Sequence, residues 1–173
     1  MSEDFRTELH PGVAALSAQD WDGLVAATPG TTPFQRHAWL AGLERTGCVG
    51  PGTGWQPVVL ALRDGGGGLV AACALYVKSH SYGEYVFDWA WAQAYAEHGL
   101  AYYPKLVLAV PFTPVAGAKL LGRDPEVRRA LLREALAIAR GAGELTTSPP
   151  PGRPKAGETP PGGVARSAGE QQT

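Results

Sequence analysis

The residues best suited to chemistry gather in one stretch of the chain, 75–117. All six tyrosines lie in it, together with two of the five tryptophans and two of the four histidines. Aromatic side chains with polar groups are costly to bury without partners, and they are useful where one end meets a ligand or water. The stretch therefore predicts a lined cleft, with an aromatic-rich core that holds no ligand as the alternative.

His80 and Glu84 are the candidates for moving protons. They lie four residues apart in a polar segment that directly follows a long apolar run. An imidazole or a carboxylate serves as a general base when it is positioned at a reacting group. Tyr82, between them, is suited to donate a hydrogen bond to a carbonyl or to orient a substrate. The alternative is that residues 80–82 only close a strand and form a turn.

Two apolar runs before this segment predict a hairpin. Residues 57–63 and 69–77 are almost continuously apolar and are joined by Asp64 and four glycines. Runs without polar alternation indicate strands with both faces covered, so we expect helices on both sides of the sheet. A third strand is expected at 104–110. Shorter extended segments are expected at 13–16 and 84–87.

Capping signals predict the helices. Ser17 begins a short one, and Thr32-Pro33 with Gln35 begins a second that Gly47 closes. Asp88 is expected to cap a third that ends at Gly99. Asp124-Pro125-Glu126 opens the longest and most amphipathic helix, which Gly141 or Gly143 ends. The glycine-rich segments 50–54 and 65–68 lack the residues of a phosphate-binding loop and are interpreted as turns.

Length and composition indicate one soluble domain and a tail. The formal charge of -1 gives no electrostatic case for DNA binding. Cys48 and Cys73 have no metal-ligand spacing and are expected to be reduced thiols. We expect no transmembrane segment and a cytoplasmic location, because the chain has no spanning apolar run and begins with a polar, acidic sequence. Residues 146–173 are rich in proline and poor in large apolar residues, so we expect them to be disordered.

Longer strings within the chain resemble one family. KSHSYGEYVFDWAWA (78–92), YYPKL (102–106) and PFTPVAG (111–117), with PFQRHAWLAGLE (33–44) and GWQP (54–57), are similar to the FemAB-like peptidoglycan biosynthesis and recognition proteins. These are members of the GNAT acyltransferase superfamily. The resemblance implies an α+β fold, with a mixed, mostly antiparallel sheet flanked by helices.

The resemblance also implies an activity and a site. An N-acetyltransferase or aminoacyltransferase domain of this kind acts on an amine of a cell-envelope or peptidoglycan precursor. Glu84 and His80 are then the expected catalytic residues, and no metal is expected. The expected substrate-binding residues are Tyr82, Asp88, Trp91, Tyr103, Lys105 and Thr113.

The acyl donor implied by the resemblance is acyl-CoA or aminoacyl-tRNA. A CoA pyrophosphate needs free amides at a helix N-terminus, and a glycine-rich turn usually precedes them. That turn is missing here, and Asp124, Pro125 and Glu126 oppose an anion at the start of the long helix. Aminoacyl-tRNA is compatible with this departure.

Family members usually carry two such domains in tandem, and residues 1–145 resemble the first. We therefore expect an incomplete fold, in a truncated or frameshifted product whose tail, 146–173, is alien to the family. Two alternatives to an active transferase stay open. They are a recognition half without catalysis and an inactive fragment. The exposed edge of the third strand predicts self-association and poor solubility.

Overall fold

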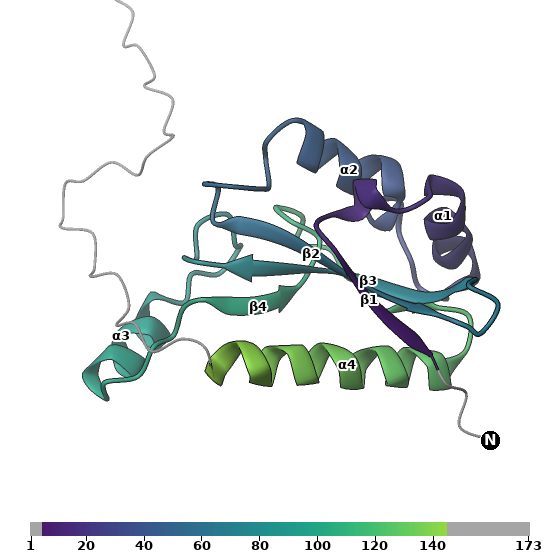
Figure 1. Ribbon diagram of the computed structural model, residues 1–173. Helices are drawn as coiled ribbons and strands as arrows, with labels where there is room; N and C mark the ends of the chain where they lie inside the picture. The colour runs from purple at the N-terminus through teal and green to yellow at the C-terminus, as the bar shows by residue number, and fades with distance from the viewer. Residues whose placement is uncertain (1–4, 145–173) are drawn as a thin grey trace, which may run out of the picture.

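The computed structural model describes residues 5–144, which form an α+β fold (Figure 1). Five strands make one antiparallel sheet in the order β1-β2-β3-β4, and β5 pairs with the start of β3, whose end pairs with β4. The strands are β1 (Arg6–His10), β2 (Trp55–Arg63), β3 (Leu69–Lys78), β4 (Lys105–Leu108) and β5 (Leu121–Gly122). The predicted fold class is confirmed.

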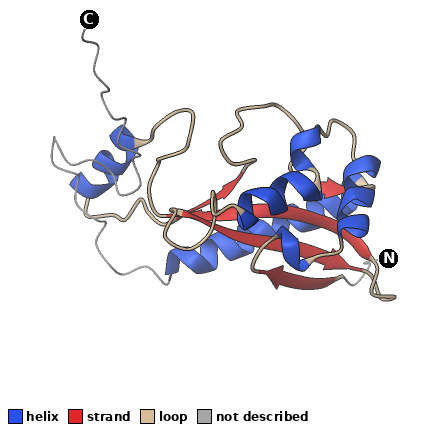
Figure 2. Ribbon diagram, turned by 90° about the horizontal axis from the view of Figure 1, so that it is seen from above, coloured by secondary structure: helices blue, strands red, loops and turns tan. Residues whose placement is uncertain are grey.

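Four α-helices and two short 3-10 helices surround the sheet. The α-helices are α1 (Ala18–Ala27), α2 (His37–Arg45), α3 (Trp89–Glu97) and α4 (Pro125–Glu144). The 3-10 helices are η1 (Val13–Ala15) and η2 (Pro33–Gln35). In both views α3 lies beyond one end of the sheet, away from α1 and α2 (Figures 1 and 2).

The central hairpin follows from the glycine run. Strands β2 and β3 pair along their whole length, from Trp55 opposite Lys78 to Arg63 opposite Leu69. In the connecting turn the Asp64 carboxylate accepts hydrogen bonds from the amides of Gly66 and Gly68, each at 2.9 Å. Gly67 has a φ of 83°, which favours glycine. The predicted hairpin and its turn are confirmed.

Helices cover both faces of the sheet, as the unbroken apolar runs predict. On one face Trp21 and Leu40, from α1 and α2, pack with Val59 and Tyr76. On the other face Leu131 and neighbouring side chains of α4 pack with Leu60 and Leu75. These two residues are sequence neighbours of Val59 and Tyr76, so their side chains point to the opposite face of the sheet. The sheet therefore stands between two apolar cores.

The predicted caps define the first helices. The Ser17 hydroxyl accepts a hydrogen bond from the Asp20 amide at 3.3 Å, and the Gln35 carboxamide oxygen accepts one from the Thr32 amide at 2.6 Å. The second predicted helix is interrupted, however. Arg36 has an extended backbone with a ψ of 147°, so the segment forms η2 and then α2 in place of one helix.

Several boundaries differ from those expected. Residues 13–15 form a 3-10 helix in place of the predicted strand, and 84–87 are not a strand. Strand β1 was not predicted at all, because its alternating polar residues gave no apolar run. Helix α4 continues past Gly141 and Gly143 to Glu144. The predicted disordered tail, 146–173, lies outside the described residues.

Candidate functional site

Two lysines meet where β3 ends and β4 begins. The register of this antiparallel pair sets Lys78 directly opposite Lys105, with Trp55 on the far side of Lys78. The 79–88 loop leaves β3 at the same point and supplies two carboxylates. Like charges on facing strand positions repel, so the pairing of these lysines depends on the acids around them.

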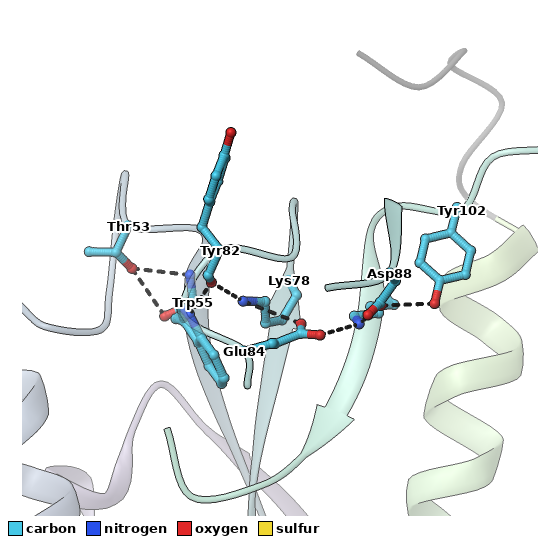
Figure 3. A network of polar contacts seen from close by, with 8 residues as sticks. Thr53, Trp55, Lys78, Tyr82, Glu84, Asp88 and Tyr102 are labelled. Carbon is cyan, nitrogen blue, oxygen red and sulfur yellow. Dashed lines mark hydrogen bonds and ion pairs between the residues drawn. The ribbon is translucent and has the colours of Figure 1, made fainter. Parts of the chain in front are cut away.

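The Glu84 carboxylate bridges the two ammonium groups, and Asp88 lies beyond it beside Tyr102 (Figure 3). Glu84 Oε2 lies 2.8 Å from Lys105 Nζ, and Glu84 Oε1 lies 3.4 Å from Lys78 Nζ. The Asp88 carboxylate also accepts a hydrogen bond from Lys105, and it accepts one from the Tyr102 hydroxyl at 2.9 Å. Two positive and two negative charges thus form one neutral network.

Lys78 is the buried member of the network. Its side chain is 0% exposed, and Nζ donates a hydrogen bond of 2.7 Å to the backbone carbonyl of Tyr82. The ammonium also lies 3.7 Å from the centroid of the Trp55 ring, within the range of a cation–π interaction. Burial lowers the pKa of Lys78, and the charge of Glu84 opposes that shift.

Lys105 and Asp88 stabilise each other in their charged forms. Burial alone would lower the pKa of Lys105, but hydrogen bonds to Asp88 and Glu84 outweigh it and raise the pKa. Burial alone would raise the pKa of Asp88, but its bonds with Lys105 and Tyr102 hold that pKa below its usual range. Burial, with the bond to Asp88, raises the pKa of Tyr102 to about 12.

Polar atoms without partners concentrate beside this network. Among residues 5–144, six buried side-chain nitrogen or oxygen atoms have no hydrogen-bond partner. Three of the six belong to His80 (Nδ1), Ser81 (Oγ) and Tyr103 (OH), and a fourth, Glu84 Oε1, has only its ion pair with Lys78 at 3.4 Å. A buried polar group costs free energy when it is unpaired, so such a cluster marks a place where a ligand or water supplies the missing partners.

His80 is held by close packing. A Cβ atom at Gly54 would lie only 2.1 Å from His80 Nε2, so Gly54 leaves the space that the ring fills. The ring of Tyr82 packs edge-on against it, with centroids 5.0 Å apart. Burial and the charge of Lys78 lower the pKa of His80 below its ordinary value of 6.5. The imidazole is therefore neutral near pH 7 and able to accept a proton.

Six of the eight predicted site residues lie at or beside this network, and two do not. Glu84, Asp88 and Lys105 are bonded to one another, and His80, Tyr82 and Tyr103 adjoin them. Trp91 is 66% exposed on α3, and the Thr113 hydroxyl only donates to the Pro111 carbonyl at 2.9 Å. Asp88 precedes α3 as predicted, but its side chain does not cap the helix.

Sequence reasoning missed four residues that build the site, namely Trp55, Lys78, Ser81 and Tyr102. Lys78 carried a usable signal, because a lysine that closes a long apolar strand must find a counter-charge or reach water. The other three gave no such signal. Their roles depend on β2 and on the segment before β4 meeting at one end of the sheet.

The predicted aromatic stretch divides into three groups. Tyr76 is buried in the core, and the rings of Tyr82 and Tyr102 are half-buried at the network. Most of the remaining aromatic side chains, with Val86 and Leu100, face outward. Those more than 40% exposed are Tyr85, Val86, Phe87, Trp89, Trp91, Tyr95, Leu100 and Phe112. An aromatic-rich core therefore does not describe this part of the chain.

The start of α4 does not fit a CoA pyrophosphate. Pro125 has no backbone N–H, and the Glu126 amide already donates to the Asp124 carboxylate at 2.8 Å. The ammonium of Lys119 is engaged by the backbone carbonyls of Val115 and Gly117. The acidic residues also repel an anion. Within residues 5–144, no group of three or more His, Cys, Asp or Glu side chains is placed to hold a metal ion.

None of the helices in the described part of the chain is both long enough and apolar enough to span a membrane. A comparison with curated proteins and one with solved structures gave no significant match. A family model for FemAB-like proteins of peptidoglycan biosynthesis and recognition matches residues 12–147. That match covers most of the chain and includes every residue of the network. The chain therefore belongs to the FemAB-like peptidoglycan biosynthesis/recognition family, which gives it a cell-wall-related role.

Proposed function

We propose that this chain is an N-acyltransferase-like domain that binds an amine of a peptidoglycan precursor at the 79–88 loop. The observation that carries the proposal is the cluster of partnerless polar atoms of His80, Ser81 and Tyr103 beside the network. A peptide ligand offers both hydrogen-bond donors and acceptors, so it can satisfy hydroxyl and imidazole groups at once.

The carboxylates suit an amine ligand. Glu84 and Asp88 both bind the ammonium of Lys105, and the rings of Tyr102 and Tyr103 lie 5.7 and 5.9 Å from it. Carboxylates with nearby aromatic faces are a favourable setting for a primary ammonium group. An acceptor ammonium would find the same partners here.

Transfer requires the bound amine to lose its proton before it attacks an acyl carbonyl, since an ammonium has a pKa near ~10.4 and no free electron pair. His80 is the better acceptor for this proton, because its imidazole is neutral at pH 7 while both carboxylates are engaged with lysines. In this assignment Glu84 and Asp88 position the amine and His80 acts as general base.

Because the start of α4 is unsuited to a CoA pyrophosphate, we favour an aminoacyl-tRNA as the acyl donor. One observation favours recognition without transfer as the second candidate. Lys105 already binds the carboxylates of Glu84 and Asp88. The ammonium group of an acceptor therefore has to compete with the Lys105 ammonium, which is held in place by its own chain.

The test combines binding and transfer on one set of variants. A lysine-bearing stem peptide and the same peptide acetylated at the lysine amine are titrated by calorimetry, and transfer is followed with radiolabelled aminoacyl-tRNA or acetyl-CoA. We expect binding of the free amine only, weakened about tenfold or more in Glu84→Gln. Thr113→Ala, which lies outside the network, is the matched control.

His80→Gln separates the two candidates. A transferase loses transfer in this variant and keeps peptide binding, and the rate of the unsubstituted chain falls only as the pH drops through the lowered pKa of His80, which lies below 6.5. A recognition domain binds the peptide and transfers nothing in any variant. If the peptide does not bind, or if the acetylated peptide binds equally well, the proposal is wrong.

A further inference from the structure

Strand β4 forms one edge of the sheet. Within residues 5–144 it pairs with β3 only, along Lys105–Leu108, and its outer side has no strand beside it. An edge strand presents a row of backbone N–H and C=O groups that can pair with another chain. Proteins usually protect such an edge with charges, proline or a covering element.

The opposite edge, β1, carries that protection. Its residues Arg6 and Glu8 form an ion pair, and Glu8 also binds Arg63 and contacts His10. Charged side chains therefore follow one another along β1, and a second chain that paired there would have to desolvate them. This edge is unsuited to self-association.

β4 lacks the same protection. Its sequence is Lys-Leu-Val-Leu, and its single charge, on Lys105, is already engaged by Glu84 and Asp88. Leu106 and Leu108 pack against the core on the α4 side, so Val107 points to the other face. Every residue of the strand is only half-buried, which leaves apolar side chains at the open margin.

The helix that precedes β4 is also uncovered. Helix α3 has no buried residue, although Trp89, Trp91 and Tyr95 are large apolar side chains. A helix that is apolar on all sides is normally enclosed by other structure. Residues 145–173 contain only two large aliphatic side chains, Leu145 and Val164, and no aromatic residue.

We infer that the β4 edge is an interface for a second copy of this chain, with β4 pairing antiparallel to β4 of its partner. A two-fold axis perpendicular to the sheet can pass beside Val107, which then faces its own copy in the partner strand. Leu106 faces the partner's Leu108, and Lys105 faces the partner's Ala109. The two lysines are therefore not opposed.

The described elements leave room for this arrangement. Helix α4 packs on one face of the sheet, mainly on β2, β3 and β5, and no described strand lies on the outer side of β4. The antiparallel pairing brings the α3 end of each copy toward the far end of the partner's β4. Part of the exposed aromatic surface is thereby covered as well, which adds apolar burial to the backbone pairing. This inference does not depend on acyl transfer.

The test is the mass of the full chain over a concentration series, measured by sedimentation velocity. We expect a mass of two chains that falls to one chain on dilution. Val107→Lys and Val107→Glu each place like charges across the axis, and each should raise the dimer Kd at least about tenfold. An equal mixture of the two variants should restore dimers. Thr7→Lys on β1 is the matched control and leaves the Kd unchanged.

Hydrogen exchange gives a second measurement that needs no variant. Dilution of the dimer should speed exchange of the amides in 105–108 and leave those in 6–10 unchanged. A chain that stays monomeric at every concentration overturns the inference. So does a dimer that tolerates both Val107 variants, and so does protection of 105–108 that does not change on dilution, because another segment then covers the edge.

Discussion

At the scale of single residues, the site depends on how a buried charge is compensated. Lys78 has no exposed side-chain surface, so its ammonium relies on Glu84, the Tyr82 carbonyl and the Trp55 ring. Desolvation makes a buried charge costly unless each of its partners is kept. The two residues of a pair need not be equally sensitive to mutation, because only one of the two changes leaves a buried charge uncompensated.

Glu84→Gln is therefore expected to destabilise the protein by about 2–4 kcal/mol, because it leaves Lys78 buried without its carboxylate. Lys78→Met removes the buried charge and keeps the side-chain volume, so it should cost less than about 1.5 kcal/mol. Urea unfolding of both single variants and the double variant checks this. Equal costs for the single variants, or strictly additive costs in the double variant, would contradict the expectation.

Residue types and a family resemblance together predicted part of this arrangement. His80, Glu84, Asp88, Tyr103 and Lys105 were recognised as candidates from their chemistry and from a family resemblance, and the fold brings them close together. Burial was not predictable in the same way. A lysine is usually exposed, and only the position of its strand between two neighbours makes Lys78 inaccessible.

At the scale of elements, the strongest predictions came from the strands with unbroken apolar sequences. β2 and β3 were predicted because a strand with two buried faces needs apolar residues at nearly every position. β1 was missed because it is an edge strand in which charged and uncharged residues alternate. The same charges hold β1 to its neighbour. Arg63 and Arg6, on the two paired strands, lower the pKa of Glu8 to about 2.

The pH dependence of Glu8 tests this attachment. The folded-state pKa lies below the ordinary value of 4.5, so the carboxylate stabilises the fold above pH 4.5 and loses that effect as the pH falls toward 2. Glu8→Gln should be less stable than the wild type at pH 7, and the difference should vanish near pH 2. Thermal unfolding at a series of pH values measures it. A difference that stays constant with pH would mean that the charge is unimportant.

At the scale of the whole molecule, one sheet is shared by two cores on opposite faces. Leu131 on α4 is fully buried in one core, and Trp21 and Trp55 are buried in the other. Because β2 and β3 contribute side chains to both, loss of packing on one face should weaken the other. The domain is therefore expected to unfold in one cooperative step.

Leu131→Ala should destabilise the protein by about 2–5 kcal/mol through loss of buried surface and the cavity left behind. The tryptophans lie on the other face of the sheet or outside the core, so their fluorescence reports on the side opposite α4. We expect fluorescence and far-UV circular dichroism to give the same, lowered midpoint in urea. Separate midpoints would show that α4 unfolds independently of the rest.

The sequence by itself determined the central hairpin and the main capping sites, because apolar runs, turn glycines and capping residues act over short distances. Its longer residue strings indicated the family, and the resemblance to that family implied the α+β class. The tertiary structure decided the site. Residues from β2, the end of β3, the 79–88 loop and the start of β4 form one charge network only because strand register puts Lys78 opposite Lys105. Such long-range placement has no local signature, and neither does the burial that shifts the pKa values of these groups.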